Sequence, residues 1–296
     1  MNRGDITMRK MTRLSLAFAI ASAACISNAG AAGQTGYLGP AGSWTHQACL
    51  DLYGAADLVP LAREDLFAQY RSGQVSRICV PVTTSAVGVT PYLDDVLALP
   101  DGQIVAEYPK MLGYSLLANP GTKREDIKQV LAHPVALEEV KPWLDKEMPD
   151  VQRVASASGG AAAQTVAKGG RHDQASMGPK VGGEIYGLVA LANGIEEGPQ
   201  NVTRWWVLGR EMPAPTGNDK TSLLVETADA QFSTVLKAID GSGVKILDIY
   251  ERPSKKTLDT HRYVVEVAGH AKVGALATFL AANPNIRVLG SYPRKY

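Results

Sequence analysis

The chain contains few cysteines, few aromatic residues and no excess of either charge. Its 296 residues include three Cys, five His, 6% aromatic residues, and 30 Lys and Arg against 29 Asp and Glu. Balanced charge disfavours a protein that wraps nucleic acid, because such a protein needs an excess of cations to displace the counterions of the phosphate backbone. We therefore expect a small-molecule partner and no nucleic acid. The length allows two or three domains with a sizeable core.

The histidines and cysteines form no recognisable metal site in the sequence. The five His are scattered, and no Cys-x-x-Cys pair or His-x-Glu cluster occurs, so we expect no zinc. Cys49 lies in a helical pattern and Cys79 in an apolar strand pattern. We interpret both as small buried hydrophobic residues, with a disulfide between them as the alternative in an oxidising compartment.

Only one apolar run stands out, and it lies near the N-terminus. Three basic residues between positions 9 and 13 precede the run at 14–26, and small residues follow at 29–32. This order is typical of a secretory signal, and the run is too short to span a bilayer. We predict that residues 1–31 form a signal peptide and that the mature protein is exported to the periplasm without a membrane segment. The alternatives are a buried N-terminal helix and, less favoured, a lipoprotein signal ending at Cys25.

The remaining chain alternates between short apolar strands and helical patterns. Each strand runs into a turn rich in Gly, Ser, Thr or His-Pro, and a helix follows. This order predicts an α/β fold whose ligand lies beyond the strand ends. The predicted strands cover 36–39, 78–82, 129–132 and 153–155, and the predicted helices cover 45–53, 136–146 and 161–168.

A polar connector at 211–220 interrupts this pattern and marks a domain boundary. Three of its residues are Pro213, Pro215 and Gly217, and it has no hydrophobic periodicity. The order beyond it is βαββαβ, which predicts a ferredoxin-like sandwich that binds a regulator or dimerises. The predicted elements are strand 221–226, helix 230–240, strands 244–251 and 261–268, helix 273–282 and strand 286–291.

Several short motifs occur in a recognisable order along the chain. They read Y-L-G-P-A-G-S-W-T-H-Q-A at 37–48, A-H-P-V-A-L at 132–137, Y-G-L at 186–188, N-V-T-R-W at 201–205, R-P-S at 252–254 and L-G-S-Y-P at 289–293. They resemble Y-L-G-P-E-G-[ST]-F-[ST]-x-x-A, S-H-P-Q-A-L, Y-G-L…N-x-T-R-F, E-S-R-P-S and L-G-S-Y-P of prephenate dehydratases with a C-terminal ACT domain. The resemblance implies a two-lobed, periplasmic-binding-protein-like α/β dehydratase domain at 34–211, a linker at 212–220 and a ferredoxin-like ACT domain at 221–296.

The resemblance also implies an activity and a set of site residues. The family converts prephenate to phenylpyruvate in phenylalanine biosynthesis, with loss of water and carbon dioxide and without a metal or cofactor. Thr203 matches the essential threonine of the family, Arg204 is expected to hold a substrate carboxylate through its planar fork, and Ser158 is expected to donate to the substrate. The expected substrate-binding residues are Ser43, Thr83, Thr84, Ser85 and Gly159.

The sequence departs from the family at several polar positions. Where the family has P-[IV]-E-N-S-x-x-G, residues 81–88 read P-V-T-T-S-A-V-G, and Ala41 and Gly159 also replace polar residues. A threonine cannot deliver a proton near neutral pH as a buried Glu can, and losing a general acid costs about 10²–10⁴ in rate. We predict a lyase of reduced activity. The alternative is an exported binding protein that captures a small aromatic carboxylate in the same cleft.

The C-terminal unit departs from the family in a similar way. Ser233, Thr234 and Val235 stand in place of the G-A-L helix start at which phenylalanine docks in the family, whereas Arg252 and Pro253 are kept. A side chain at Ser233 would crowd a close backbone approach that glycine allows. We therefore expect weak or no regulation by phenylalanine at these residues, and the resemblance implies a homodimer through this sheet.

Overall fold

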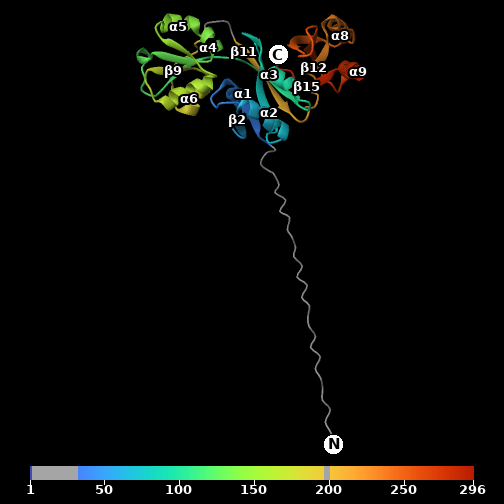
Figure 1. The fold of residues 1–296 in the computed structure, drawn as a ribbon, viewed down its shortest axis with the longest axis horizontal. Helices are drawn as coiled ribbons and strands as arrows, with labels where there is room; N and C mark the ends of the chain where they lie inside the picture. Colours follow the sequence, from blue (N-terminus) through green and yellow to red (C-terminus); the bar gives the residue numbers. More distant parts are fainter. Residues whose placement is uncertain (2–32, 197–200) are drawn as a thin grey trace. The chain divides into compact units, whose positions relative to one another are not determined.

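The computed structural model describes Met1 and residues 33–196 and 201–296, which form three β-sheets covered by helices. The predicted signal peptide at 1–31 lies outside the described residues, apart from Met1. Figure 1 shows the sheet that contains β11 between the sheet that contains β9 and the sheet that contains β12. We refer to these three parts as the first lobe, the second lobe and the C-terminal unit.

The first lobe is a mixed sheet in the order β2-β1-β3-β11-β5, with β4 paired to β3. β1 runs parallel to β2 and β3, whereas β11 runs antiparallel to β3 and β5. Its strands are β1 (Thr35–Leu38), β2 (Leu58–Leu61), β3 (Arg77–Thr84), β4 (Gly88–Val89), β5 (Gln103–Met111) and β11 (Val202–Gly209). Its helices are α1 (Trp44–Tyr53), α2 (Arg63–Ser72) and α3 (Tyr92–Leu97).

The second lobe is a sheet in the order β10-β6-β9-β7-β8. Its strands are β6 (Ser115–Ala118), β7 (Gln129–Ala132), β8 (Gln152–Ala155), β9 (Gln174–Gly178) and β10 (Val189–Asn193). Its helices are α4 (Pro134–Glu139), α5 (Lys141–Glu147), α6 (Gly159–Gly169) and α7 (Val181–Tyr186), and a 3₁₀ turn covers Arg124–Asp126. The helix predicted over 136–146 is two helices, because Pro142 has no backbone N–H with which to continue the first one.

The C-terminal unit has the predicted βαββαβ order, with sheet order β13-β14-β12-β15. Its elements are β12 (Asp219–Ala228), α8 (Asp229–Gly241), β13 (Ile246–Pro253), β14 (Thr260–Ala268), α9 (Gly274–Ala282) and β15 (Arg287–Pro293). The helix predicted at 230–240 is confirmed as α8, and the residues that replace the G-A-L motif of the family do not stand at its start. Helix α8 already begins at Asp229, so these residues lie in its second turn, where Ser233 and Thr234 are exposed.

The C-terminal unit packs directly on the first lobe. One hydrophobic cluster joins Trp206 and Leu208 of β11 to Val264, Leu289 and Tyr292 of the C-terminal unit. Arg252, which the resemblance places in a regulatory motif, donates two hydrogen bonds to the Asp94 carboxylate on α3 at 2.9 and 2.7 Å. This guanidinium therefore ties the C-terminal unit to the first lobe and holds the pKa of Asp94 below its usual value.

Gly290 marks the tightest approach between these two parts. A Cβ built on it would overlap the backbone of Ile104 on β5. We expect Gly290→Ala to lower the free energy of unfolding by about 1–3 kcal/mol, because overpacking forces the backbone to shift. Thermal unfolding followed by circular dichroism would measure this change. Gly241→Ala is the matched control, since a Cβ there meets nothing within 4 Å and alanine favours the helix; equal melting temperatures for the two variants would contradict the prediction.

Cys49 and Cys79 are free thiols in the core of the first lobe. Both are fully buried, and burial, together with the neighbouring Cys79 thiol, raises the pKa of Cys49. The structure thus places them as the buried hydrophobic residues that the sequence favoured.

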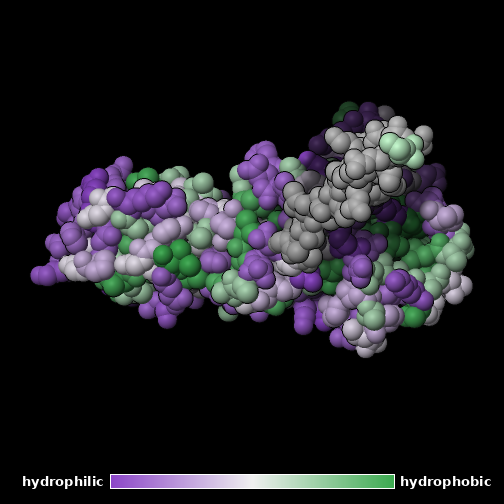
Figure 2. All heavy atoms as spheres, turned by 90° about the horizontal axis from the view of Figure 1, so that it is seen from below, coloured by the Kyte–Doolittle hydropathy of each residue, from purple (hydrophilic) through white to green (hydrophobic). Residues whose placement is uncertain are grey.

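No helix among the described residues has the length and apolarity needed to cross a bilayer. On the face drawn in Figure 2, hydrophobic residues form small groups among hydrophilic ones.

Candidate active site

A cavity of about 390 Å³ opens between the two lobes. The first lobe lines it with residues from β1, β3, β11 and the start of α1, and the second lobe lines it with residues that follow β7 and β8. This is the position that the strand-turn-helix pattern predicted, since ligands of α/β folds lie beyond the strand ends. Its volume suits a ligand with a single ring.

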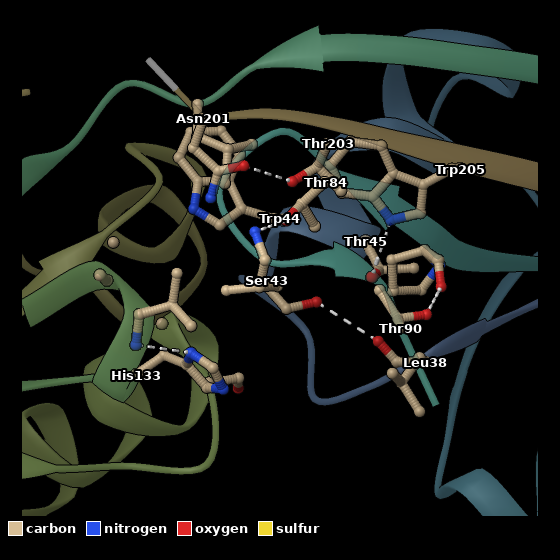
Figure 3. Close-up of a pocket in the computed structure, with 18 of the residues that line it drawn as sticks. Leu38, Ser43, Trp44, Thr45, Thr84, Thr90, His133, Asn201, Thr203 and Trp205 are labelled. Carbon is tan, nitrogen blue, oxygen red and sulfur yellow. Dashed lines mark hydrogen bonds between the residues drawn. The ribbon is translucent and has the colours of Figure 1, made fainter. Parts of the chain in front are cut away.

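Thr203 and Thr84 place two hydroxyl groups side by side in this cavity. They are paired residues of the neighbouring strands β11 and β3, and both line the cavity (Figure 3). Thr84 Oγ1 accepts a hydrogen bond from the backbone N–H of Val87 at 3.0 Å, so its own proton is available to a ligand. Thr203 Oγ1 donates to Asn201 Oδ1 at 3.3 Å. The predicted catalytic threonine therefore lies at the cavity wall.

Two helix N-termini from different lobes also face the cavity. Ser43 Oγ caps α1 by accepting from the N–H of His46 at 3.2 Å, and Ser158 Oγ caps α6 by accepting from the N–H of Ala161 at 3.0 Å. Ser43, Ser158 and Gly159 all line the cavity, as predicted. A Cβ on Gly160 would lie 2.7 Å from the oxygen of Ala41, so the two helix starts approach each other closely. Free backbone N–H groups and the positive ends of two helix dipoles favour an anion here.

The described residues that line the cavity include no Asp, Glu, Lys or Arg. His133 caps α4 and lines the cavity, and burial lowers its pKa. Tyr114 also lines the cavity, and burial and the neighbouring Glu139 raise the pKa of its phenol. Both groups are therefore uncharged at neutral pH. An anionic ligand would be held by hydroxyl groups, backbone N–H groups and helix dipoles rather than by a cation.

Arg204 does not face the cavity, contrary to the prediction. It is 3% exposed and lies on the opposite face of β11, where its Nη1 is 2.8 Å from Glu266 and 3.4 Å from Glu107. Burial lowers the pKa of Arg204, but Glu266 and the nearby tyrosines together outweigh this effect, so the pKa is raised. Successive residues of a strand point to opposite faces, so Thr203 and Arg204 cannot both contact the same ligand. Arg204 joins the first lobe to the C-terminal unit.

Thr83 and Ser85 are the other predicted substrate-binding residues that the structure places elsewhere. Thr83 Oγ1 accepts from Arg204 Nε at 3.3 Å, so it lies on the same face as Arg204. Ser85 Oγ accepts from the backbone N–H of Val202 at 2.8 Å and does not contribute to the lining of the cavity. The same alternation along β3 explains both corrections, because Thr84 lies between them and faces the cavity.

Thr83 and Thr84 offer a matched test of this alternation. We expect Thr84→Val to raise KM about tenfold, because it removes a hydroxyl that can donate to a charged substrate group. Thr83→Val should leave KM unchanged, since this side chain faces Arg204. Steady-state kinetics of both variants with prephenate would measure the difference. A larger effect at Thr83 than at Thr84 would contradict the assignment.

Asn201, Tyr114 and His133 also line the cavity, although the sequence did not predict them as site residues. Asn201 immediately precedes β11 and lies two residues before Thr203, which was a usable signal for a shared face. His133 follows a strand and precedes a proline, which is a usable signal for a helix cap. Tyr114 carried no such signal, because it reaches the cavity only through the packing of the two lobes.

Comparisons with known proteins identify the family of this chain. The family model described as prephenate dehydratase matches residues 35–213. A prephenate dehydratase of Mycolicibacterium gilvum is 34% identical over 282 residues, covering 87% of this chain and 90% of the relative.

Two solved structures resemble most of this chain. The prephenate dehydratase of Arthrobacter aurescens in complex with L-Phe has a TM-score of 0.79 and 28% identity, over 88% of this chain and 90% of that one. GqqA, described as a novel type of quorum quenching acylase, has a TM-score of 0.80 over 88% of this chain and 98% of that one. Because its identity is 21%, it shows the fold alone. By the family model that matches residues 35–213 and by its relatives, the chain belongs to the prephenate dehydratase family.

Proposed function

We propose that this chain converts prephenate to phenylpyruvate. The observation that carries the proposal is that Thr203 and Thr84, which are register partners on β11 and β3, both line a cavity of about 390 Å³. Membership of the dehydratase family supports the same reaction. These findings favour an enzyme over a binding protein that retains only the cleft.

The reaction needs a site that holds a dianion and helps a hydroxyl group leave. The ring carboxylate departs as carbon dioxide, and the electron pair of the broken C–C bond completes the aromatic ring. The ring hydroxyl takes up one proton, which the solvent supplies in the overall balance, and leaves as water. The N-termini of α1 and α6 favour the carboxylates. The Thr84 hydroxyl can donate to the reacting part of the substrate, and the Thr203 oxygen, whose proton goes to Asn201, offers it lone pairs.

An assay of the full chain with prephenate at neutral pH tests this proposal. Formation of phenylpyruvate is followed over time, and the spontaneous acid-catalysed conversion is subtracted with a sample that lacks protein. We expect saturable turnover above this background. A rate equal to the background, together with a rise in melting temperature on adding prephenate, would instead support the binding protein.

We propose further that the C-terminal unit is an ACT domain and forms a homodimer. The βαββαβ order and the motifs at 252–254 and 289–293 support this assignment. The relative from Arthrobacter aurescens was solved in complex with L-Phe. A thermal-shift titration with phenylalanine and size-exclusion chromatography with light scattering would test ligand binding and dimer formation separately.

We also propose that residues 1–31 direct export to the periplasm. The order of basic, apolar and small residues supports this location. Cell fractionation and N-terminal sequencing of the recovered protein would test it. A protein that stays in the cytoplasm with its first thirty residues intact would contradict it.

A further inference from the structure

A buried carboxyl group lies directly behind the wall of the cavity. Glu139, the last residue of α4, is 4% exposed. One of its oxygens accepts from the hydroxyl of Tyr114 at 2.7 Å, and the other accepts from Asn201 Nδ2 at 2.5 Å. Tyr114 and Asn201 both line the cavity, whereas Glu139 does not. The carboxyl group therefore acts on the cavity only through its partners.

The Glu139 carboxylate determines how the Asn201 side-chain amide is oriented. Because Nδ2 of Asn201 donates to Glu139, its Oδ1 faces Thr203 and accepts from the Thr203 hydroxyl at 3.3 Å. The Thr203 proton thus points at Asn201, and the lone pairs of Thr203 Oγ1 remain available to a ligand. If the amide turned over, Nδ2 would face Thr203 and the hydroxyl proton would turn toward the cavity.

We propose that Glu139 is a positioning residue that fixes the Asn201 amide and thereby sets the direction of the Thr203 hydroxyl; this inference rests on the proposed function. The chain of contacts also crosses between the lobes, since Glu139 belongs to α4 and Thr203 to β11. A variant without the Glu139–Asn201 hydrogen bond should keep the cavity and lose the fixed orientation of the Thr203 hydroxyl group.

The protonation of Glu139 gives this arrangement a pH dependence. Burial raises the pKa of Glu139, and the hydrogen bonds from Tyr114 and Asn201 offset part of this effect. Tyr114 is the titratable group in contact with it, and Glu196 accepts from the backbone N–H of Tyr114 at 2.7 Å. On its own helix, His133 is the cap and Glu138 is exposed. As the pH falls through the raised pKa, a protonated Glu139 can no longer accept from both donors, so turnover should fall on the acid side.

Glu139→Gln tests the proposal with the shape of the side chain conserved. A glutamine presents one oxygen and one NH₂ group, so it cannot accept from both Tyr114 and Asn201. We expect kcat to fall about 100-fold with a much smaller change in KM, because the reacting groups are misplaced while the cavity remains. The acid limb of the kcat profile should also disappear. Glu138→Gln is the matched control on the same helix and should leave kcat, KM and the pH profile unchanged.

Nuclear magnetic resonance of the Asn201 side-chain amide gives a second measurement that does not need turnover. Its signals, assigned by their loss in Asn201→Asp, should titrate with Glu139 in the wild type and not in Glu139→Gln. A wild-type kcat and acid limb in a folded Glu139→Gln, or an Asn201 amide that does not titrate, would overturn the proposal. If the wild type fails to convert prephenate, the proposed function fails, and the amide titration still decides whether Glu139 positions Asn201.

Discussion

Thr203→Val is expected to lower kcat for prephenate about 10²–10³-fold, the range found when one preorganised hydrogen-bonding group is removed from an active site. Valine has nearly the shape of threonine, so the cavity and the strand pair β3–β11 should persist. The loss would come from the hydroxyl group that donates to Asn201 at the cavity wall (Figure 3). Single-turnover kinetics with saturating protein would separate this loss from any change in substrate binding.

Thr203→Ser is the matched control, because it returns the hydroxyl group without the methyl group. We expect its kcat to lie much closer to that of the wild type than to that of Thr203→Val. Equal activity of Thr203→Val and the wild type would show that this hydroxyl takes no part in the reaction. Equal loss in both variants would assign the effect to packing around β11.

Much of the fold could be predicted from local patterns in the sequence. The strand at 129–132 and the βαββαβ order of the C-terminal unit were confirmed, because alternating and helical periodicity act over a few residues. Within the described ranges, the prediction missed β2, α2, β5, β6 and several later elements. Their positions depend on pairing between distant segments, such as β11 inserted between β3 and β5.

The site was predicted in part, and its errors have a physical cause. Thr203, Thr84, Ser43, Ser158 and Gly159 line the cavity as predicted. Arg204, Thr83 and Ser85 do not, because adjacent residues of a strand alternate between its two faces. Had the N-V-T-R-W motif been predicted as a strand, this rule would have placed Thr203 and Arg204 on opposite faces.

Glu139 illustrates what the sequence could not supply. It stands after a motif that the resemblance covers, but nothing in its spacing connects it to Thr203. Its role depends on how the two lobes pack, which places α4 against Tyr114 and Asn201. The departures from the family pattern pointed to residues 83–84, whereas the acid that hydrogen bonds connect to Thr203 through Asn201 lies on the other lobe.

Glu266→Gln is expected to destabilise the protein by about 3–5 kcal/mol, the typical cost of breaking a buried ion pair by removing one partner. Glu266 is fully buried and lies 2.8 Å from Arg204 and 3.6 Å from Lys220. Glu107, the other carboxylate of this cluster, is 3.0 Å from Lys220. The variant leaves two buried cations against one carboxylate. The apparent Tm should therefore fall by about 10 °C in thermal unfolding.

Two further variants separate charge from packing in this cluster. Glu226→Gln, in the same sheet, removes an exposed partner of Lys256 and should change stability by less than about 1 kcal/mol. Adding Lys220→Met to Glu266→Gln restores one cation to one carboxylate, so part of the lost stability should return. If Glu266→Gln melts like the wild type, the cluster does not hold the C-terminal unit on the first lobe. If the double variant does not regain stability, the loss comes from the contacts of the Glu266 side chain with Ser222 and Tyr292 rather than from its charge.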